Sequence, residues 1–165
     1  MFGMEFINKE PFKDIYVHAL VRDEKGQKMS KSKGNVIDPL DLIEKYSADA
    51  LRFTLLSMAS PGRDVKLSED RVKGYRNFLN KLWNANNFLT HNNCKFTSLK
   101  KISKSKININ KWIYSELIKT KTTVEKNIKE YRFDEAAKNL YQFVWHSYCD
   151  WYLELSKTIL YSDDK

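Results

Sequence analysis

Two lysines and two serines lie together in the segment Lys28-Met29-Ser30-Lys31-Ser32, with Lys33 and Gly34 directly after it. Small hydroxyl residues and a nearby glycine let a backbone bend closely around a ligand. Ammonium groups of lysines stabilise the negative charge that develops on a phosphoryl group during its transfer. A basic loop of this kind can close over a nucleotide after the nucleotide has bound. The segment therefore indicates a mobile phosphate-binding loop.

The chain contains a second copy of these letters, which serves as an internal comparison. Ser103-Lys104-Ser105-Lys106 repeats Ser30-Lys31-Ser32-Lys33. No glycine follows the second copy and no strand pattern precedes it. The first copy lies between a predicted strand and a predicted helix, and a short motif acquires its meaning from such surroundings. We therefore interpret the second copy as an ordinary solvated linker.

A strand before the loop and a helix after it are expected to position the first copy. Apolar side chains alternate at period two over residues 15–21, which predicts a short, largely buried strand. The turn Asp23-Glu24-Lys25-Gly26 follows, with Gly26 available for a positive φ. Asp38 and Pro39 are typical of the start of a helix, with Asp38 as its cap.

Helical spacing dominates the rest of the chain. Ser47 can cap a second short helix. Ser68, Asn110 and Asp134 are each expected to cap a long helix in which apolar residues recur every three or four positions. Three long amphipathic helices with short loops predict an antiparallel bundle. The polar, lysine-rich residues 91–110 are predicted to form a mobile connection within it.

Composition limits the class of protein. Of 165 residues, 42% are hydrophobic and 13% aromatic, which is enough to build a core and argues against wholesale disorder. Lysine and arginine total 29 against 21 acidic residues, which gives a net charge of +8. Such a surplus suits a polyanionic partner. A lysine-rich surface that only maintains solubility is the alternative, and charge alone slightly favours it.

Cysteine usage and hydropathy point to a cytoplasmic protein. Cys94 and Cys149 have no CxxC spacing, so no zinc site is indicated and both are expected to be reduced thiols. No run of about eighteen apolar residues occurs, so no membrane span is expected. The N-terminus lacks the pattern of a signal peptide.

The loop and its flanks carry a family resemblance. Residues 11–23, the stretch KMSKSKGN at 28–35, and Val36-Ile37-Asp38-Pro39 together resemble the second signature region of class I aminoacyl-tRNA synthetases. The motif KMSKS is complete. The resemblance implies that Lys28 and Lys31 bind the phosphates of ATP during amino-acid activation and are the catalytic groups, with Lys31 in the more direct contact.

The same resemblance implies the remaining parts of the ATP site. Met29, Ser30 and Ser32 would shape the ATP-binding loop. ATP is the implied cofactor, and Mg²⁺ would enter only as the counter-ion of ATP, with no metal-binding residues identifiable in the chain.

Several segments resemble the valyl branch of this family in particular. They are Asp49–Phe53, Ala59–Asp64, Gly74–Phe78, Lys81–Ala85 and Cys149–Lys157. The branch implies valine and ATP as substrates and the valine tRNA as partner of the full-length enzyme, which is expected to be a monomer. An isoleucyl enzyme is the alternative within the class, because it shares the neighbourhood of KMSKS.

The resemblance also implies the fold and the domains. Residues 1–58 would be the C-terminal segment of a Rossmann-type catalytic domain with its junction, and residues 59–165 a helical anticodon-binding domain. The fold class is therefore mainly α. The HIGH-type signature and the editing insertion of the family are missing from the sequence, so the chain alone is expected to be inactive.

Basic and aromatic residues are the candidates for contact with tRNA. In the family, the region of Arg63, Arg71, Arg76 and Lys81 approaches the inner side of the L-shaped tRNA, and a solvated face is the equal alternative. Four tryptophans could stack on bases. Trp83 and Trp151 are instead expected in the core because apolar residues surround them, while the choice stays open for Trp112 and Trp145.

Two interpretations from other classes remain. One is a helical RNA-binding module without catalysis, and the other is a helical interaction protein whose charge serves only solubility.

Overall fold

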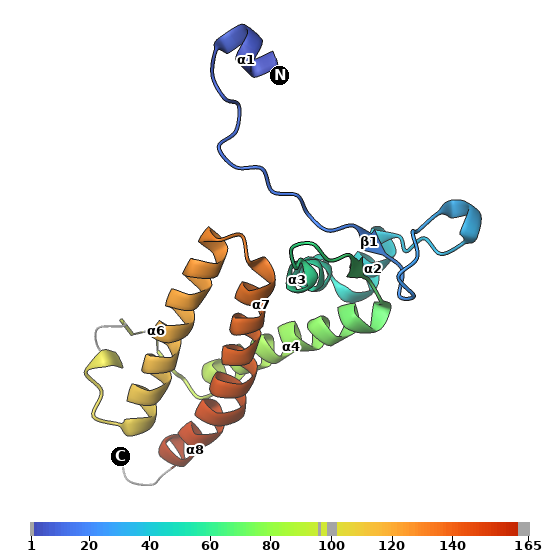
Figure 1. Cartoon of the computed structure of the whole chain (residues 1–165). Coiled ribbons are helices and arrows are strands. Elements are labelled where there is room, and N and C mark those ends of the chain that lie inside the picture. The colour runs from blue at the N-terminus through green and yellow to red at the C-terminus, as the bar shows by residue number, and fades with distance from the viewer. Residues whose placement is uncertain (1, 96, 99–101, 162–165) are drawn as a thin grey trace.

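Helices account for most of the protein in a computed structural model that describes residues 2–95, 97–98 and 102–161 (Figure 1). The elements are α1 (Phe2–Ile7), β1 (Val21–Arg22), the 3₁₀ turn η1 (Lys31–Lys33), α2 (Pro39–Tyr46), α3 (Ala48–Met58), β2 (Val65–Lys66), α4 (Glu69–His91), α6 (Asn108–Lys129), α7 (Phe133–Gln142), the π-helical stretch η2 (Phe143–Leu153) and α8 (Glu154–Leu160). The predicted mainly helical class is confirmed.

The predicted strand over residues 15–21 is wrong except at its end. β1 pairs in parallel with β2, with Val21 opposite Val65. Residues 8–19, after α1, form an extended tail that pairs with no strand in the described part of the chain (Figure 1), and Ile15 and Val17 are 83% and 84% exposed. Alternating apolar residues favour a strand, but a strand also needs a hydrogen-bonding neighbour, and β2 supplies one for only two residues.

Two predicted helix caps near the loop are confirmed. Asp38 Oδ1 accepts a hydrogen bond from the backbone N–H of Leu40 at 2.8 Å and starts α2. Ser47 Oγ accepts from the backbone N–H of Ala50 at 3.3 Å and starts α3. Ser47 has a φ of 89°, which turns the chain sharply between the two helices.

The caps predicted for the long helices are less accurate. Ser68 is at the N-cap of α4, but its side chain makes no capping hydrogen bond. α6 begins at Asn108, and Asn110 instead accepts a hydrogen bond from the hydroxyl of Tyr152 at 3.0 Å. α7 begins at Phe133, so Asp134 lies in its first turn, where a carboxylate favours the positive end of the helix.

Two buried clusters hold the helices together. The first is made by Leu42, Tyr46, Ala50, Leu51, Leu67 and Val72, which come from α2, α3, α4 and the residue after β2. The second is made by Ala85, Cys149 and Leu153, from α4 and η2. A row of aromatic rings runs between them and includes Phe53, Phe78, Tyr141 and Trp145 at centroid separations of 4.8–6.4 Å.

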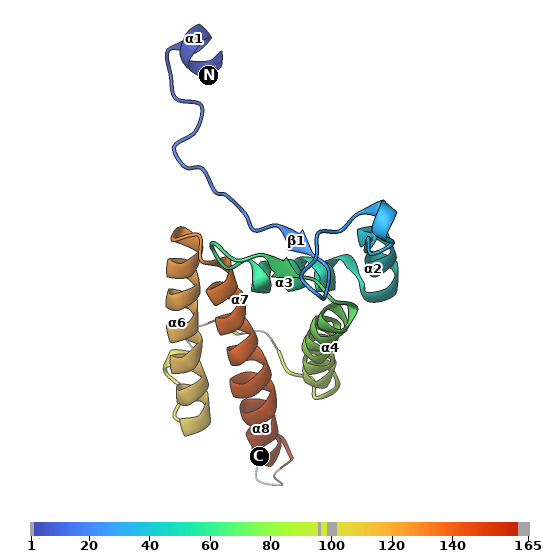
Figure 2. The same ribbon diagram turned by 45° about the vertical axis from the view of Figure 1, so that its right-hand side comes forward.

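The predicted antiparallel bundle is confirmed for α6 and the helix that follows it. α7, η2 and α8 continue one another as a single helical rod, which lies side by side with α6 and runs in the opposite direction (Figures 1 and 2). α4 crosses this pair obliquely and packs on η2. In the part of the chain that the structure describes, no helix is long and apolar enough to cross a bilayer.

The tryptophan predictions divide into two outcomes. Trp145 stacks on Tyr141 at 5.4 Å between ring centroids and belongs to the aromatic row. Trp83 and Trp151, which were expected in the core, are 67% and 61% exposed. That expectation is wrong because α4 turns the side of Phe78 and Ala85 toward the rod, and Trp83 therefore points elsewhere.

Candidate phosphate-binding loop and nucleic-acid interface

A tight turn after β1 delivers the chain to the basic loop. The Asp23 carboxylate accepts a hydrogen bond from the backbone N–H of Gln27 at 2.6 Å. The backbone N–H of Gly26 donates to the carbonyl of Asp23 at 2.9 Å. Gly26 has a φ of 80°, as predicted for the glycine of this turn. The turn lies next to the two-stranded sheet, which fixes where the loop begins.

Asn35 closes the base of the loop formed by residues 28–34. Its amide Nδ2 donates to the Asp23 carboxylate at 2.9 Å and to the carbonyl of Lys28 at 3.2 Å. Its Oδ1 accepts from the backbone N–H of Ser30 at 2.9 Å. We refer to Asp23 and Asn35 together as the clip. The hydrogen bond from Asn35, followed by that from Gln27, holds the pKa of Asp23 below its ordinary value.

Sequence reasoning missed the clip. Asn35 was seen only as one letter of a polar stretch, although it directly follows Gly34. Gly34 adopts a φ of 65°, which folds the chain back toward the start of the loop. An amide placed directly after such a glycine is the signal that the sequence offered, because side chains of this type bond readily to nearby backbone groups.

The tip of the loop is more ordered than a plain loop. Residues 31–33 form the 3₁₀ turn η1, in which the backbone N–H of Lys33 donates to the carbonyl of Ser30 at 3.1 Å. The hydroxyls of Ser30 and Ser32 lie 2.7 Å apart. Met29 packs against the first buried cluster and anchors the loop to α2 and α3. Met29, Ser30 and Ser32 therefore help to hold the shape of the turn.

The lysines of the loop, unlike Met29, are open to solvent. Lys28, Lys31 and Lys33 are all exposed. Among the residues that the structure describes, none of the three ammonium groups has a carboxylate partner. Three unpaired cations on one turn create a positive potential that attracts a polyphosphate. The loop therefore presents an accessible surface whose charge suits a polyphosphate.

The second copy of the motif has different surroundings. Ser105 Oγ accepts hydrogen bonds from the backbone N–H of Ile107 and from Asn110, both at 3.2 Å, so this copy leads directly into α6. Lys104 is exposed. The connection predicted over residues 91–110 includes residues 96 and 99–101, which lie outside the described residues. Among the described residues between α4 and α6, there is no strand.

The basic residues proposed for tRNA contact fall into two groups. Arg63, in the turn before β2, and Arg71 and Arg76, on α4, are exposed. Lys81 faces the rod, where it forms an ion pair with Asp150 and lies 4.2 Å from the centre of the Trp145 ring. The ion pair with Lys81 holds the pKa of Asp150 below its ordinary value, with a smaller contribution from His146.

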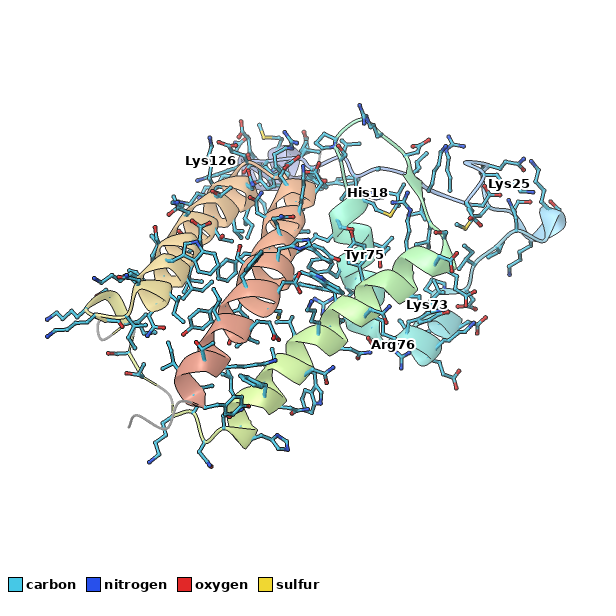
Figure 3. All side chains as sticks on the ribbon, turned by 90° about the horizontal axis from the view of Figure 1, so that it is seen from below. His18, Lys25, Lys73, Tyr75, Arg76 and Lys126 are labelled. Carbon is cyan, nitrogen blue, oxygen red and sulfur yellow. The ribbon has the colours of Figure 1, made fainter. Side chains whose placement is uncertain are left out.

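Figure 3 shows this division along α4. Lys73 and Arg76 lie on one side of the helix and Tyr75 lies on the side toward α7, where its ring is 6.1 Å from that of Tyr141. A cleft of about 450 Å³ opens between α4 and α7, and Arg71 lines it together with Glu135. Lys73 and Arg76 are therefore on a surface distinct from the helix packing contacts, whereas Arg71 borders the cleft on the side of Tyr75.

A larger and mainly apolar hollow lies elsewhere. It measures about 760 Å³ and lies between residues 16–21 and α3, with Phe53, Leu55 and Leu56 among its lining residues. His18 also lines it and bonds locally to the carbonyl of Ala19 at 2.8 Å. The hollow is separate from the basic loop, and its charged lining residues, Asp49 and Arg52, form an ion pair with each other.

Comparison with protein families divides the chain into two matched regions. A family model described as "tRNA synthetases class I (I, L, M and V)" matches residues 1–68. A second model, "Anticodon-binding domain of tRNA ligase", matches residues 110–165. Residues 69–109, which include all of α4, lie between the two matches.

Two similar proteins are named valine–tRNA ligase. The chain is 81% identical over 165 residues to valine–tRNA ligase of Pelagibacter ubique. This alignment covers 100% of the chain and 19% of that protein. It is 55% identical over 164 residues to valine–tRNA ligase of Bradyrhizobium diazoefficiens, in an alignment that covers 99% of the chain and 17% of that protein. The chain thus spans about a fifth of the length of the curated relatives that it matches.

A solved structure shares the fold. It is the LeuRS of Agrobacterium radiobacter K84 agnB2 in the ternary complex LeuRS-tRNA-LeuAMS, with a TM-score of 0.66 and 23% sequence identity. The similarity covers 81% of the chain and 18% of that protein.

Proposed function

The chain belongs to the class I tRNA synthetase family, and we propose that it forms the KMSKS-bearing and tRNA-binding part of a valine–tRNA ligase. The 81% identity over the whole chain to a valine enzyme supports valine rather than isoleucine. In this reaction the valine carboxylate attacks the α-phosphate of ATP and releases pyrophosphate. The terminal ribose hydroxyl of the tRNA then takes the valyl group and releases AMP.

We propose the domain boundary where the sequence places it, with residues 1–58 in the catalytic domain and residues 59–165 in the anticodon-binding domain. The two family-model matches, which end at 68 and begin at 110, support a division of this kind. Leu67 and Val72 share a buried cluster with Leu42. The start of the second domain therefore packs firmly on the end of the first.

The loop carries the phosphate half of the proposal. Lys31, at the tip, takes the role of the direct contact to the phosphates that leave as pyrophosphate, and Lys28 reaches them from the base. The observation that supports this role is the set of unpaired, exposed ammonium groups on a turn that the clip and Met29 hold in place. Mg²⁺ is assigned to ATP as its counter-ion.

The loop proposal is tested by single-turnover formation of valyl-adenylate in the full-length ligase that contains this segment. Lys31→Ala should slow the step about a hundredfold and change ATP affinity much less, because the ammonium group acts where charge develops. Lys104→Ala, in the second copy, is the matched control and should leave the rate unchanged. An unchanged rate in Lys31→Ala with weaker ATP binding would contradict the role in the transition state.

The helical part carries the tRNA half of the proposal. A net charge of +8 attracts a phosphate backbone, and Arg63, Arg71 and Arg76 are exposed for such contacts. Lys81 stays in the proposed set, but its ammonium group must leave Asp150 before it can reach a phosphate. Phosphate contacts position the RNA, so preference for the valine tRNA has to come from contacts with unpaired bases.

Binding of the valine tRNA to the chain, followed by fluorescence anisotropy at two salt concentrations, tests this half. We expect dissociation constants on the order of micromolar that rise steeply with salt. An anticodon-swapped tRNA is the control for base recognition. Absence of salt-dependent binding to either tRNA would favour the alternative of a plain interaction protein.

We also propose a cytoplasmic location for the protein. Cys94 and Cys149 are both free thiols in the structure, one exposed and one buried. A reducing compartment keeps such thiols unpaired.

A further inference from the structure

The turn that joins α6 to α7, residues 130–132, contains an unusual residue. The backbone N–H of Arg132 donates to the carbonyl of Asn127 at 2.8 Å. The backbone N–H of Tyr131 donates to the carbonyl of Ile128 at 3.1 Å. These two hydrogen bonds form the Schellman motif, in which the residue after the C-cap is left-handed and is usually glycine. Here that residue is Tyr131, with a φ of 57°.

α4 ends in the same motif, with a residue that suits it better. The backbone N–H of Cys94 donates to the carbonyl of Leu89, and that of Asn93 donates to the carbonyl of Thr90, both at 3.0 Å. The left-handed residue is Asn93, with a φ of 52°. Asparagine enters this conformation more readily than a bulky aromatic residue does. Tyr131 is therefore strained, and strained residues persist where the side chain has a use.

The side chain of Tyr131 contacts the extended tail. Its ring lies 6.0 Å from the ring of Tyr16 and 6.2 Å from that of Phe133, measured between centroids. The rings of Tyr16 and Phe133 meet edge-on at 5.5 Å. A hydrogen bond with the Asp14 carboxylate raises the pKa of Tyr131 above its ordinary value. Three rings and one hydrogen bond therefore tie the turn to residues 14–16.

This contact joins the two parts of the proposed enzyme. Residues 14–16 belong to the segment that leads into β1 and then into the phosphate-binding loop. Tyr131 lies at the end of α6, in the helical part. The contact therefore sets how this end of the α6–α7 pair lies against the segment before the loop.

The neighbouring helix packing makes such a contact useful. α7 packs on α3, and the buried side chains of α7 are those of Ala136 and Ala137. Methyl groups allow two helices to approach closely, but they make few contacts that resist a tilt of one helix on the other. The rings of Tyr131 and Tyr16 supply a second point of contact beyond these alanines. Two separated contacts resist a tilt that one contact permits.

We propose that Tyr131 is a positioning residue for the transfer of valine to tRNA, because it fixes the helical part in the orientation that brings a bound tRNA to the active site. This role rests on the proposed function. Tyr131 acts through Tyr16 and Asp14 rather than through a contact with the substrates. A displacement of reacting groups by about 1 Å can slow a reaction about a hundredfold. Loss of the contact should therefore slow transfer more than it weakens tRNA binding.

Single-turnover transfer of valine from enzyme-bound valyl-adenylate to the valine tRNA tests this role in the full-length ligase that contains this segment. The rate constant at saturating tRNA, the tRNA concentration at half saturation and ATP–pyrophosphate exchange are measured. Tyr131→Gly removes the ring and the hydroxyl but keeps a backbone that favours a positive φ. Tyr131→Phe removes only the hydroxyl. Glu130→Gln is the matched control, because Glu130 is an exposed residue of the same turn.

We expect Tyr131→Gly to lower the transfer rate constant about tenfold, with the half-saturating tRNA concentration and pyrophosphate exchange within about twofold of the parent. Tyr131→Phe keeps the three-ring contact and should recover most of the rate. Glu130→Gln should match the parent. The melting temperature of the chain with Tyr131→Gly should stay within about 2 °C of the parent, because relief of backbone strain offsets the lost contacts.

The outcomes separate this inference from the proposed function. An unchanged transfer rate in Tyr131→Gly would overturn the positioning role and leave the assignment as a ligase intact. A higher half-saturating tRNA concentration with an unchanged rate constant would overturn it too, because Tyr131 would then serve tRNA binding. An equal loss in Glu130→Gln, or a parallel loss of pyrophosphate exchange, would reveal a general disturbance of the fold and overturn it as well. A parent ligase that transfers no valine to the valine tRNA would remove the proposed function, and the role of Tyr131 with it.

Discussion

Asn35→Ala removes the clip that closes the phosphate-binding loop. The variant loses two hydrogen bonds to the backbone, one from Ser30 N–H at 2.9 Å and one to the carbonyl of Lys28 at 3.2 Å. The first is half-buried and contributes about 1 kcal/mol, and the second is exposed and contributes about 0.5 kcal/mol. Their sum of roughly 1.5 kcal/mol makes opening of the loop about tenfold more frequent. The bond from Asn35 to Asp23 is lost as well.

Amide hydrogen exchange of the chain measures this opening directly. Exchange at Ser30, Lys33 and Gly34, whose N–H groups are bonded within the loop, should accelerate about tenfold. Asn84→Ala, which changes an exposed amide on α4, is the control and should leave these residues unaffected. Unchanged exchange in Asn35→Ala would refute the view that the clip orders the loop.

The clip also predicts a pH dependence. The pKa of Asp23 is lowered in the folded chain, chiefly by the hydrogen bond from Asn35. The ionised Asp23 carboxylate therefore stabilises the folded loop fully above the ordinary pKa of an aspartate, 3.8. This stabilisation is lost as the pH falls through the lowered pKa of Asp23. Exchange at Ser30, corrected for the intrinsic pH effect, should rise only in this acidic range, and the rise should be absent in Asn35→Ala.

Three further results are expected for the chain. Asp150→Asn breaks the partly exposed ion pair with Lys81, which contributes about 1 kcal/mol or less to stability, and should lower the melting temperature measured by circular dichroism by about 2 °C. Asp49→Asn is the control, because its ion pair with Arg52 lies at the surface. An equal fall in melting temperature for both variants would contradict the role of Lys81 in packing. Burial raises the pKa of Tyr148 to about 12. In an ultraviolet titration, Tyr148→Phe should therefore lack the tyrosine that ionises last in the parent chain. If the variant instead lacks a tyrosine that ionises near pH 10, Tyr148 is not buried. Trypsin should cut first within residues 91–110, where lysines are clustered in polar sequence, and a first cut inside α6 would argue against an accessible connection.

Local signals in the sequence predicted the loop well. The positive φ of Gly26 and the caps at Asp38 and Ser47 depend on neighbouring residues, and all three are present. The position of KMSKS between a turn and a capped helix follows from the same local rules. The contact of Met29 with the buried cluster and the bonds of Asn35 depend on how the chain folds back, and composition alone does not reveal them.

Features that depend on distant partners were harder to predict. Trp83 lies beside Leu82 and four residues after Leu79, so helical spacing allows either side of α4 to face the core. The choice is made by the rod, which packs on Phe78 and Ala85. Lys81 reads as one more surface cation in the sequence, because its partner Asp150 is 69 residues away. The alternating pattern of residues 15–20 likewise does not reveal whether another strand lies beside them, and β2 pairs only with Val21 and Arg22.

The most direct test of the account is a chimeric enzyme. The corresponding fifth of the Pelagibacter ubique valine–tRNA ligase, which is 81% identical, is replaced by this chain, and aminoacylation of the valine tRNA is measured with valine and with isoleucine. We expect the chimera to charge the tRNA with valine at a rate close to that of the parent ligase, and to lose about a hundredfold with Lys31→Ala. A folded chimera that fails to charge the tRNA, or that is indifferent to Lys31→Ala, would contradict the assignment.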